Sequence, residues 1–226
     1  MLMLAKTALQ RRPVGPGVFA GPSFVAAGAK QNSPDIGTIN IPYYAGIAAN
    51  DIAVIWVMVA GSGVSTPSGF TAISGTPTIG GYHIQSYWRR LVGNETGTLP
   101  FTIPSGNNGS TGLMFGLRGC ITSGTPYEGF AQTSWTASTT TMTSPATTTT
   151  GPNRLGVRLF IGNEAGVSTP PAGWTESHED LSTVGNPKLT IVDTKGILAA
   201  TTEAASSRTI TASFAGAIHA SAFIPA

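Results

Sequence analysis

The hydrophobic and polar positions along the chain follow the two-residue period of β-strands and give little sign of helix. Residues 52–59 are apolar at every position, which predicts a strand covered on both faces. In residues 154–163 every second position is apolar, which places four side chains on one face: Leu155, Val157, Leu159 and Ile161. The first of these strands is therefore expected to be covered on both faces, and the second to place its apolar side chains on one face.

Turn residues divide the chain from residue 23 onward into short predicted strands. We expect strands at 23–29, 35–41, 51–61, 71–74, 82–92, 99–103 and 112–118, and then at 128–136, 139–146, 154–163, 175–178, 188–193, 207–212 and 217–224. A helical pattern is present only at 2–10 and, more weakly, at 196–205. Short strands at this spacing are typical of sandwiches and barrels.

One segment of the sequence occurs twice. Residues 63–71 read GVSTPSGFT and residues 166–175 read GVSTPPAGWT. The flanking strands also correspond, 51–57 to 154–160, 24–26 to 130–132 and 117–119 to 223–225. The chain is therefore interpreted as two copies of one unit, about 24–119 and 130–225, which follow an extended N-terminal arm at 1–23.

These patterns predict an all-β protein, an antiparallel two-sheet sandwich of jelly-roll type built from an internal duplication. In such a body, residues 24–226, each sheet is expected to draw strands from both copies, which leaves fewer exposed edges. Two tandem sandwiches are the alternative. The junction at 119–130 is short and lacks linker composition, which favours one body.

The repeated motif is interpreted as structural. Proline fixes φ and glycine supplies a positive φ, so that the pair forms a tight turn, and the aromatic residue that follows starts the next strand and covers the end of the core. The residues concerned are Pro67, Gly69 and Phe70 in the first copy and Pro170, Gly173 and Trp174 in the second. An exposed aromatic residue at this loop would instead suit a sugar or a partner protein.

Charge is scarce and unevenly placed. Only 10% of the 226 residues are charged, and the net charge of +2 is too small to favour nucleic acid. No acid precedes Asp35, whereas Lys6, Arg11 and Arg12 lie in the arm. A basic arm suits an acidic partner surface, although an ordinary polar tail has the same composition. A surface with few charges is easily covered, which favours assembly.

The search for chemistry gives no catalytic site. Cys120 is the single cysteine, which excludes an intrachain disulfide, and it reads as a small buried thiol. Glu176, His178 and Asp180 alternate as metal ligands on one strand face would, but they follow a turn and are interpreted as a solvated loop. We therefore expect no enzyme activity, no metal and no cofactor. The longest apolar run, 52–60, reads as a strand and not as a membrane span.

Several motifs together carry a family resemblance: NDIAV at 50–54, TPSGFT at 66–71, YWR at 87–89, LRGC at 117–120, TPPAGWTE at 169–176 and a last apolar strand that ends at 224–225. The chain resembles tailed-bacteriophage virion structural proteins of the duplicated β-sandwich type, described as minor tail or capsid-associated proteins. Where that family shows Gly-Asp before the first strand, this chain has Asn50-Asp51. The resemblance implies a virion component without enzyme activity, and it transfers no functional residue.

Two functions follow as expectations. The first is a capsid decoration or cement protein whose arm makes assembly contacts through Lys6, Arg11, Arg12 and Phe19. Its partners would be the major capsid protein or neck and tail proteins, together with further copies of itself, and neither a membrane nor nucleic acid is expected. The second is a minor tail or fibre-associated protein that binds a host glycan or receptor through Trp88, Trp135 or Trp174. A depolymerase ranks third because acidic residues are few.

Overall fold

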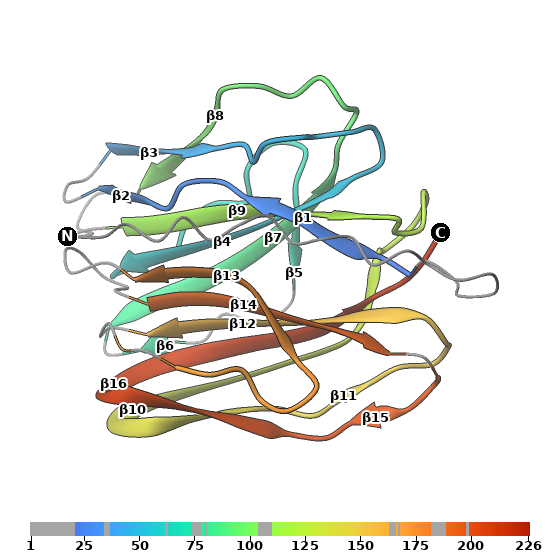
Figure 1. Ribbon diagram of the computed structural model, residues 1–226. Helices are drawn as coiled ribbons and strands as arrows, with labels where there is room; N and C mark the ends of the chain where they lie inside the picture. Colours follow the sequence, from blue (N-terminus) through green and yellow to red (C-terminus); the bar gives the residue numbers. More distant parts are fainter. Residues whose placement is uncertain are drawn as a thin grey trace, which may run out of the picture.

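The computed structural model describes residues 21–226 apart from 34–36, 62, 74–77, 80, 104–109, 163–165, 167, 182–188 and 198. All regular structure within these ranges is β-strand (Figure 1). The helical turns expected near 196–205 are wrong, because strand β14 (Leu189–Ile197) runs into this segment and β15 (Thr202–Glu203) follows it. The other candidate helix, at 2–10, lies outside the described residues.

The first half of the chain forms one large antiparallel sheet. Its strand order is β1 (Ser23–Ala27), β9 (Ser110–Arg118), β4 (Ile52–Ala60), β7 (Tyr82–Arg90) and β5 (Thr71–Ile73). Two short strands extend it, β2 (Gln31–Ser33) on β9 and β6 (Thr78–Ile79) on β7. A separate two-stranded sheet, β3 (Gly37–Pro42) with β8 (Thr98–Ile103), covers its outer face.

The second half forms the other large sheet. Its strand order is β10 (Tyr127–Ser144), β16 (Ser206–Phe223), β12 (Arg154–Gly162), β14 and β13 (Thr175–Leu181), while β11 (Thr147–Thr148) pairs with β15. The expectation that each sheet mixes strands of both copies is therefore wrong. Strands that follow one another along the chain pair or lie close together within each half, as short connections favour. The segment that leads from β9 to β10 carries the chain from one sheet to the other.

The two large sheets share a strand order and a register. Strand β4 lies between β7 and β9 just as β12 lies between β14 and β16. In the sequence repeat, Ile52 corresponds to Leu155 and Leu117 corresponds to Phe223. In the structure Ile52 pairs with Leu117, and Leu155 likewise pairs with Phe223. One correspondence is displaced. The repeat aligns Phe24 with Phe130 and Leu117 with Phe223. Phe24 does pair with Leu117, but it is Tyr127, and not Phe130, that pairs with Phe223.

The main core lies between the two large sheets. One face of β4 contributes Ile52, Val54, Trp56 and Met58, and the predicted face of β12 contributes Leu155, Val157, Leu159 and Ile161. The other face of β4 packs against β3 and β8, so the prediction that β4 is covered on both faces is confirmed. A single core thus contains residues of both halves.

Strands β10 and β16 are much longer than predicted, because each of them joins two of the expected strands. Residues 131–144 contain no glycine, asparagine or proline, and a run of threonine residues keeps the backbone extended. The pairing shifts register between Trp135 and Thr139 and again by Thr141, which lets the ribbon bend. The last residues of β10 pair with the first residues of β16, and we call these the distal ends of the two strands. They cover the outer face of their own sheet around Met142, Phe160 and Ile210.

Candidate functional site: the groove between β1 and β13

The repeated turn motif has the same geometry in both halves. The Phe70 amide donates to the Pro67 carbonyl at 3.1 Å, and the Trp174 amide donates to the Pro171 carbonyl at 3.0 Å. Gly69 and Gly173 have φ values of 78° and 80°, which L side chains rarely adopt. The second turn therefore begins at Pro171, one residue after the Pro170 that the sequence had matched to Pro67.

The aromatic residues of this motif are buried. The guanidinium carbon of Arg158 lies 3.8 Å from the centroid of the Trp174 ring, and that of Arg89 lies 5.9 Å from the Phe70 centroid. Trp88 and Trp135 are half-buried and pack against core clusters. Phe70 and Trp174 therefore lack the open face that a sugar-binding platform needs, and Trp88 and Trp135 are covered in part.

The acidic segment 176–180 lies in strand β13 and not in a solvated loop. The pairing with β14 shifts between Glu176 and His178, which breaks their alternation. Glu176 bonds to Arg208, and Asp180 lies 2.6 Å from Lys30. Burial lowers the pKa of His178. In the part of the chain that the structure describes, no group of three or more His, Cys, Asp or Glu residues is arranged to hold a metal.

Ser86 and His219 lie in contact, although no sequence motif links these two residues. Ser86 Oγ lies 2.7 Å from His219 Nδ1, and this contact joins the two large sheets across the core. Burial lowers the pKa of His219 to about 4. The adjoining cavity has a volume of about 20 Å³, which is room for one water molecule but for no substrate. The pair is therefore part of the interior. The Cys120 thiol is also buried, and burial raises its pKa to about 12.

A second unforeseen feature is a buried ionic cluster on the outer face of the second sheet. Arg208 donates to Asp193 Oδ1 at 2.7 Å and to Glu176 Oε2 at 2.8 Å. Arg158 donates to the Ala204 carbonyl at 2.9 Å and to the Ser206 hydroxyl. Burial raises the pKa of Asp193 to about 7, although the nearby arginine residues act in the opposite direction. The side chains of Arg208 and Asp193 are fully buried, so we assign the cluster to stability.

An open groove of about 680 Å³ lies between β1 and β13. Both are edge strands, β1 of the first large sheet and β13 of the second, and they run close to one another (Figure 1). Residues 22–27 form one wall and residues 175–177 the other, while Leu155 and Thr194 lie between them and Arg118 lies at the rim. The strand order of the sheets creates this site, and no local sequence motif marks it.

The β1 wall is apolar yet incompletely covered. Phe24, Val25, Ala26 and Ala27 are all partly exposed, and the strand carries no charged residue. Exposed apolar edge strands are templates for pairing with another segment, and natural proteins usually protect them with charges or a covering element. The opposite wall is polar, with Thr175, Glu176 and Ser177. The groove therefore offers an apolar side and a polar, acidic side to an extended segment.

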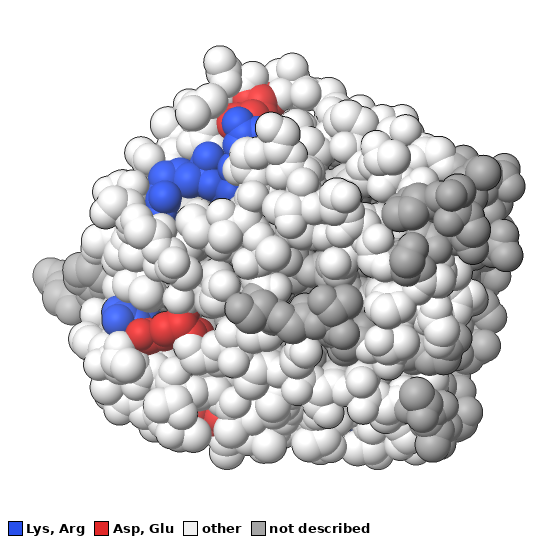
Figure 2. All heavy atoms as spheres, turned by 180° about the vertical axis from the view of Figure 1, so that it is seen from behind, with Lys and Arg blue, Asp and Glu red and all other residues white. Residues whose placement is uncertain are grey.

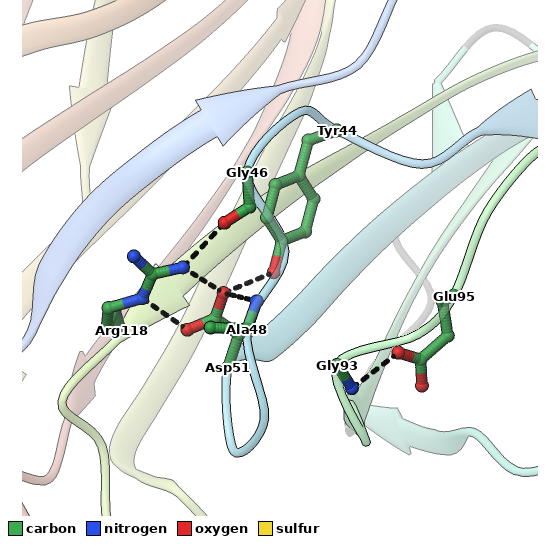
Figure 3. Close-up of polar contacts among 7 residues, drawn as sticks. All are labelled: Tyr44, Gly46, Ala48, Asp51, Gly93, Glu95 and Arg118. Carbon is green, nitrogen blue, oxygen red and sulfur yellow. Dashed lines mark hydrogen bonds and ion pairs between the residues drawn. The ribbon is translucent and has the colours of Figure 1, made fainter.

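A set of polar contacts fixes the Arg118 end of the groove (Figure 3). Arg118 donates from Nε to Asp51 Oδ1 at 2.8 Å and from Nη2 to Asp51 Oδ2 at 2.7 Å, and it also reaches the Gly46 carbonyl at 2.6 Å. The Ala48 amide and the Tyr44 hydroxyl donate to the same carboxylate. Burial, together with Asp51, raises the pKa of Tyr44. The charge of Arg118 is thus balanced, and its side chain is held in place.

Lys6, Arg11, Arg12 and Phe19, the expected contact residues of the arm, lie outside the described residues. No helix in the described ranges is long and apolar enough to cross a membrane. Comparison with known proteins finds no matching family model, no matching curated protein and no matching solved structure. The resemblance to virion proteins therefore rests on the sequence motifs alone.

Proposed function

We propose that this chain is a non-enzymatic structural protein of a tailed-bacteriophage virion, and specifically a capsid decoration or cement protein. The observation that carries the proposal is the apolar, partly exposed edge of β1 beside the edge of β13. An extended segment of another virion protein, or of a second copy, can add to such an edge through main-chain hydrogen bonds. The N-terminal arm would supply further assembly contacts.

The sparse charge of the surface supports this proposal. Most of the described surface on the face seen in Figure 2 is free of charged side chains, and the lysine, arginine, aspartate and glutamate residues on it lie mainly in small mixed groups. A neighbouring subunit can cover such a surface at low desolvation cost. The proposal places the protein in the virion as a homo-oligomer, in contact with the major capsid protein or with neck and tail proteins.

The proposal also includes an origin by duplication and a jelly-roll type of sandwich. The duplication is supported by the shared strand order and by the matching register of Ile52–Leu117 and Leu155–Phe223. Asn50 and Asn153 add to this support. They are the non-glycine residues with positive φ in the described ranges, and each lies just before a central strand.

The alternative, a tail or fibre-associated protein that binds a host glycan, has less support. It needs exposed aromatic side chains, and Trp88, Trp135 and Trp174 are half-buried or buried. No observation on the described residues favours this alternative over the structural assignment.

The copy number per particle tests the proposal. Purified virions would be analysed by quantitative mass spectrometry, with the major capsid protein of the same sample as the internal standard. Hundreds of copies per particle are expected for a decoration protein. A few to a few dozen copies would move the protein to the neck, tail or fibres. Its absence from virions would overturn the proposal.

A further inference from the structure

Strand β10 forms a long border of the second large sheet, on the side away from β13. Within the described residues it pairs only with β16, so its other edge is open to a further strand (Figure 1). Its 18 residues include one charged side chain, Glu128, which bonds to Arg154. Natural proteins usually protect an edge of this kind with charges, prolines or a covering element. The nearly uncharged edge of β10 therefore suits contact with another chain.

One regular run of β10 is suited to receive an added strand. The pairing of β10 with β16 shifts register before Ala131 and again after Trp135, and such irregularities disturb the pairing of an edge with a further strand. Between them, residues 131–135 keep an unbroken register with β16 and span about 17 Å. A second regular run, 141–144, is shorter. We therefore expect a strand to add along 131–135.

The side chains of this run allow it to pair with the same run of a second molecule. In an antiparallel pair with twofold symmetry that is centred on Thr133, Ala131 lies opposite Trp135 of the second molecule. Gln132 then lies opposite Ser134. No charge meets a like charge, and threonine pairs and aromatic side chains are favourable cross-strand neighbours. Trp135 is only half-buried within one molecule, so the second molecule would cover it further.

The other borders of the two large sheets are less suited to pair with themselves. Strand β13 carries Glu176, Glu179 and Asp180, which an antiparallel copy of the strand would bring close to the same acids. The register of β1 is broken between Phe24 and Ala27, and β13 lies beside this strand. Strand β5 has three residues. Length, regularity and lack of charge are thus combined at β10.

We propose that two molecules of this protein associate through residues 131–135 of β10, so that their second sheets join into one continuous sheet. The contact is isologous, as in most symmetric dimers. A ladder of five residues is small for a protein interface, so we expect a dissociation constant on the order of micromolar. The groove beside β1 stays open for another protein, as the proposed function requires. The inference rests on the edge of β10 and is independent of the virion assignment.

Sedimentation velocity of the full chain tests this proposal. The wild-type protein should change from monomer to dimer as its concentration rises from about 1 μM to on the order of 100 μM. Thr133→Lys places two ammonium groups opposite one another at the symmetry axis, which should weaken the dimer at least tenfold. The matched control, Thr71→Lys, makes the same change at an exposed position of the edge strand β5 and should leave the dimer unchanged.

Disulfide trapping gives an independent measurement that also reports the register. Opposite residues of an antiparallel pair have Cα atoms about 4.5–5.5 Å apart, which is within the range of a disulfide. Thr133→Cys should therefore form a covalent dimer under mild oxidation, whereas Thr71→Cys should remain monomeric. The buried Cys120 thiol is not expected to take part.

A protein that stays monomeric at the highest concentration would overturn the proposal. A dimer that Thr133→Lys leaves intact would also overturn it, and would assign self-association to another surface. Circular dichroism checks that each variant is folded, and the cysteine variant decides the question if the lysine variant does not fold. Absence of the protein from virions would overturn the proposed function but would leave these results intact.

Discussion

The outer faces of the two large sheets occupy matching places in the fold but are held together by different forces. On the first sheet, Ile55 of β4 pairs with Tyr87 and Met114, and all three lie in an apolar cluster under β3 and β8. On the second sheet, Arg158 of β12 pairs with Asp193 and Ala220 under the distal ends of β10 and β16. The same architecture thus tolerates either an apolar outer face or one in which buried ionic groups lie beside the apolar cluster of Met142, Phe160 and Ile210.

The difference matters because the two kinds of packing respond differently to change. Apolar burial is non-directional and loses stability in proportion to the area removed. A buried ion pair contributes little relative to an apolar substitute, but the loss of one partner leaves a charge without compensation. The second half should therefore be the more sensitive half to single substitutions and to pH.

The largest expected effect comes from breaking the ionic cluster. Arg208→Ala removes both contacts to Asp193 and Glu176 and should lower the free energy of unfolding by about 3–5 kcal/mol, measured by chemical denaturation. The double variant Arg208→Met with Asp193→Leu imitates the first half and should recover most of that loss. A loss below about 1 kcal/mol in Arg208→Ala would show that removing this arginine does not leave Asp193 as an uncompensated buried charge.

A pH dependence of somewhat smaller size should come from His219. Its pKa falls from 6.5 to about 4 on folding, so the unfolded chain binds more protons between these pH values. The contribution of His219 to stability should therefore decrease as pH falls from about 6.5 to about 4, by up to about 3 kcal/mol. Asp193, whose pKa burial raises to about 7, acts in the opposite direction over the same range, so the contribution of His219 is the difference between the wild-type protein and a variant that lacks it. Urea denaturation across this range measures the decrease.

The matched control for this prediction comes from the first half. His219 pairs with Leu159, and Leu113 pairs with Trp56, which places Leu113 and His219 at equivalent positions of the two sheets. His219→Leu with Ser86→Ala should remove this part of the pH dependence and leave that of the carboxylates. An unchanged slope in the double variant would show that another group causes it.

The smallest expected effect should be equal in the two halves. Gly69→Ala and Gly173→Ala place a side chain at a positive φ, which costs about 1–2 kcal/mol. The nearest atoms to the new Cβ lie 3.7 Å and 3.9 Å away, so no clash adds to this cost. Thermal or chemical unfolding of the two variants should agree within about 0.5 kcal/mol. A clear difference would mean that the two turns have different surroundings.

Local patterns predicted the parts of the fold that depend on local sequence. The apolar run of β4 and the alternation of Leu155, Val157, Leu159 and Ile161 identified the core-facing side chains of these two strands. The expectation that each large sheet mixes strands of both copies was wrong, because pairing depends on the connections and not on the composition of one strand. Arg158 is an example. By its pattern it belongs on a solvent face, but residues 204–208 cover it from a distant part of the chain.

The candidate site shows the same limit. The groove exists because β1 and β13 are the edges of two stacked sheets, and nothing in residues 23–27 or 175–181 alone indicates this. The partly exposed apolar residues of β1 would have looked like an ordinary edge strand. The acidic segment 176–180 was visible in the sequence, but its place in the edge strand β13 was not, and it was mistaken for a loop.

The contacts around Gly119 have a consequence for chain connectivity. The Ala226 amide donates to the Gly119 carbonyl at 2.9 Å, and a Cβ on Gly119 would lie 3.7 Å from the Pro22 Cα. The beginning and the end of both halves therefore meet at one corner of the molecule. The fold requires the two sheets to face one another, but it does not require a particular half to come first. A circular permutant that joins residue 226 to residue 22 by a short linker and opens the chain near residue 122 would keep every strand pair described above.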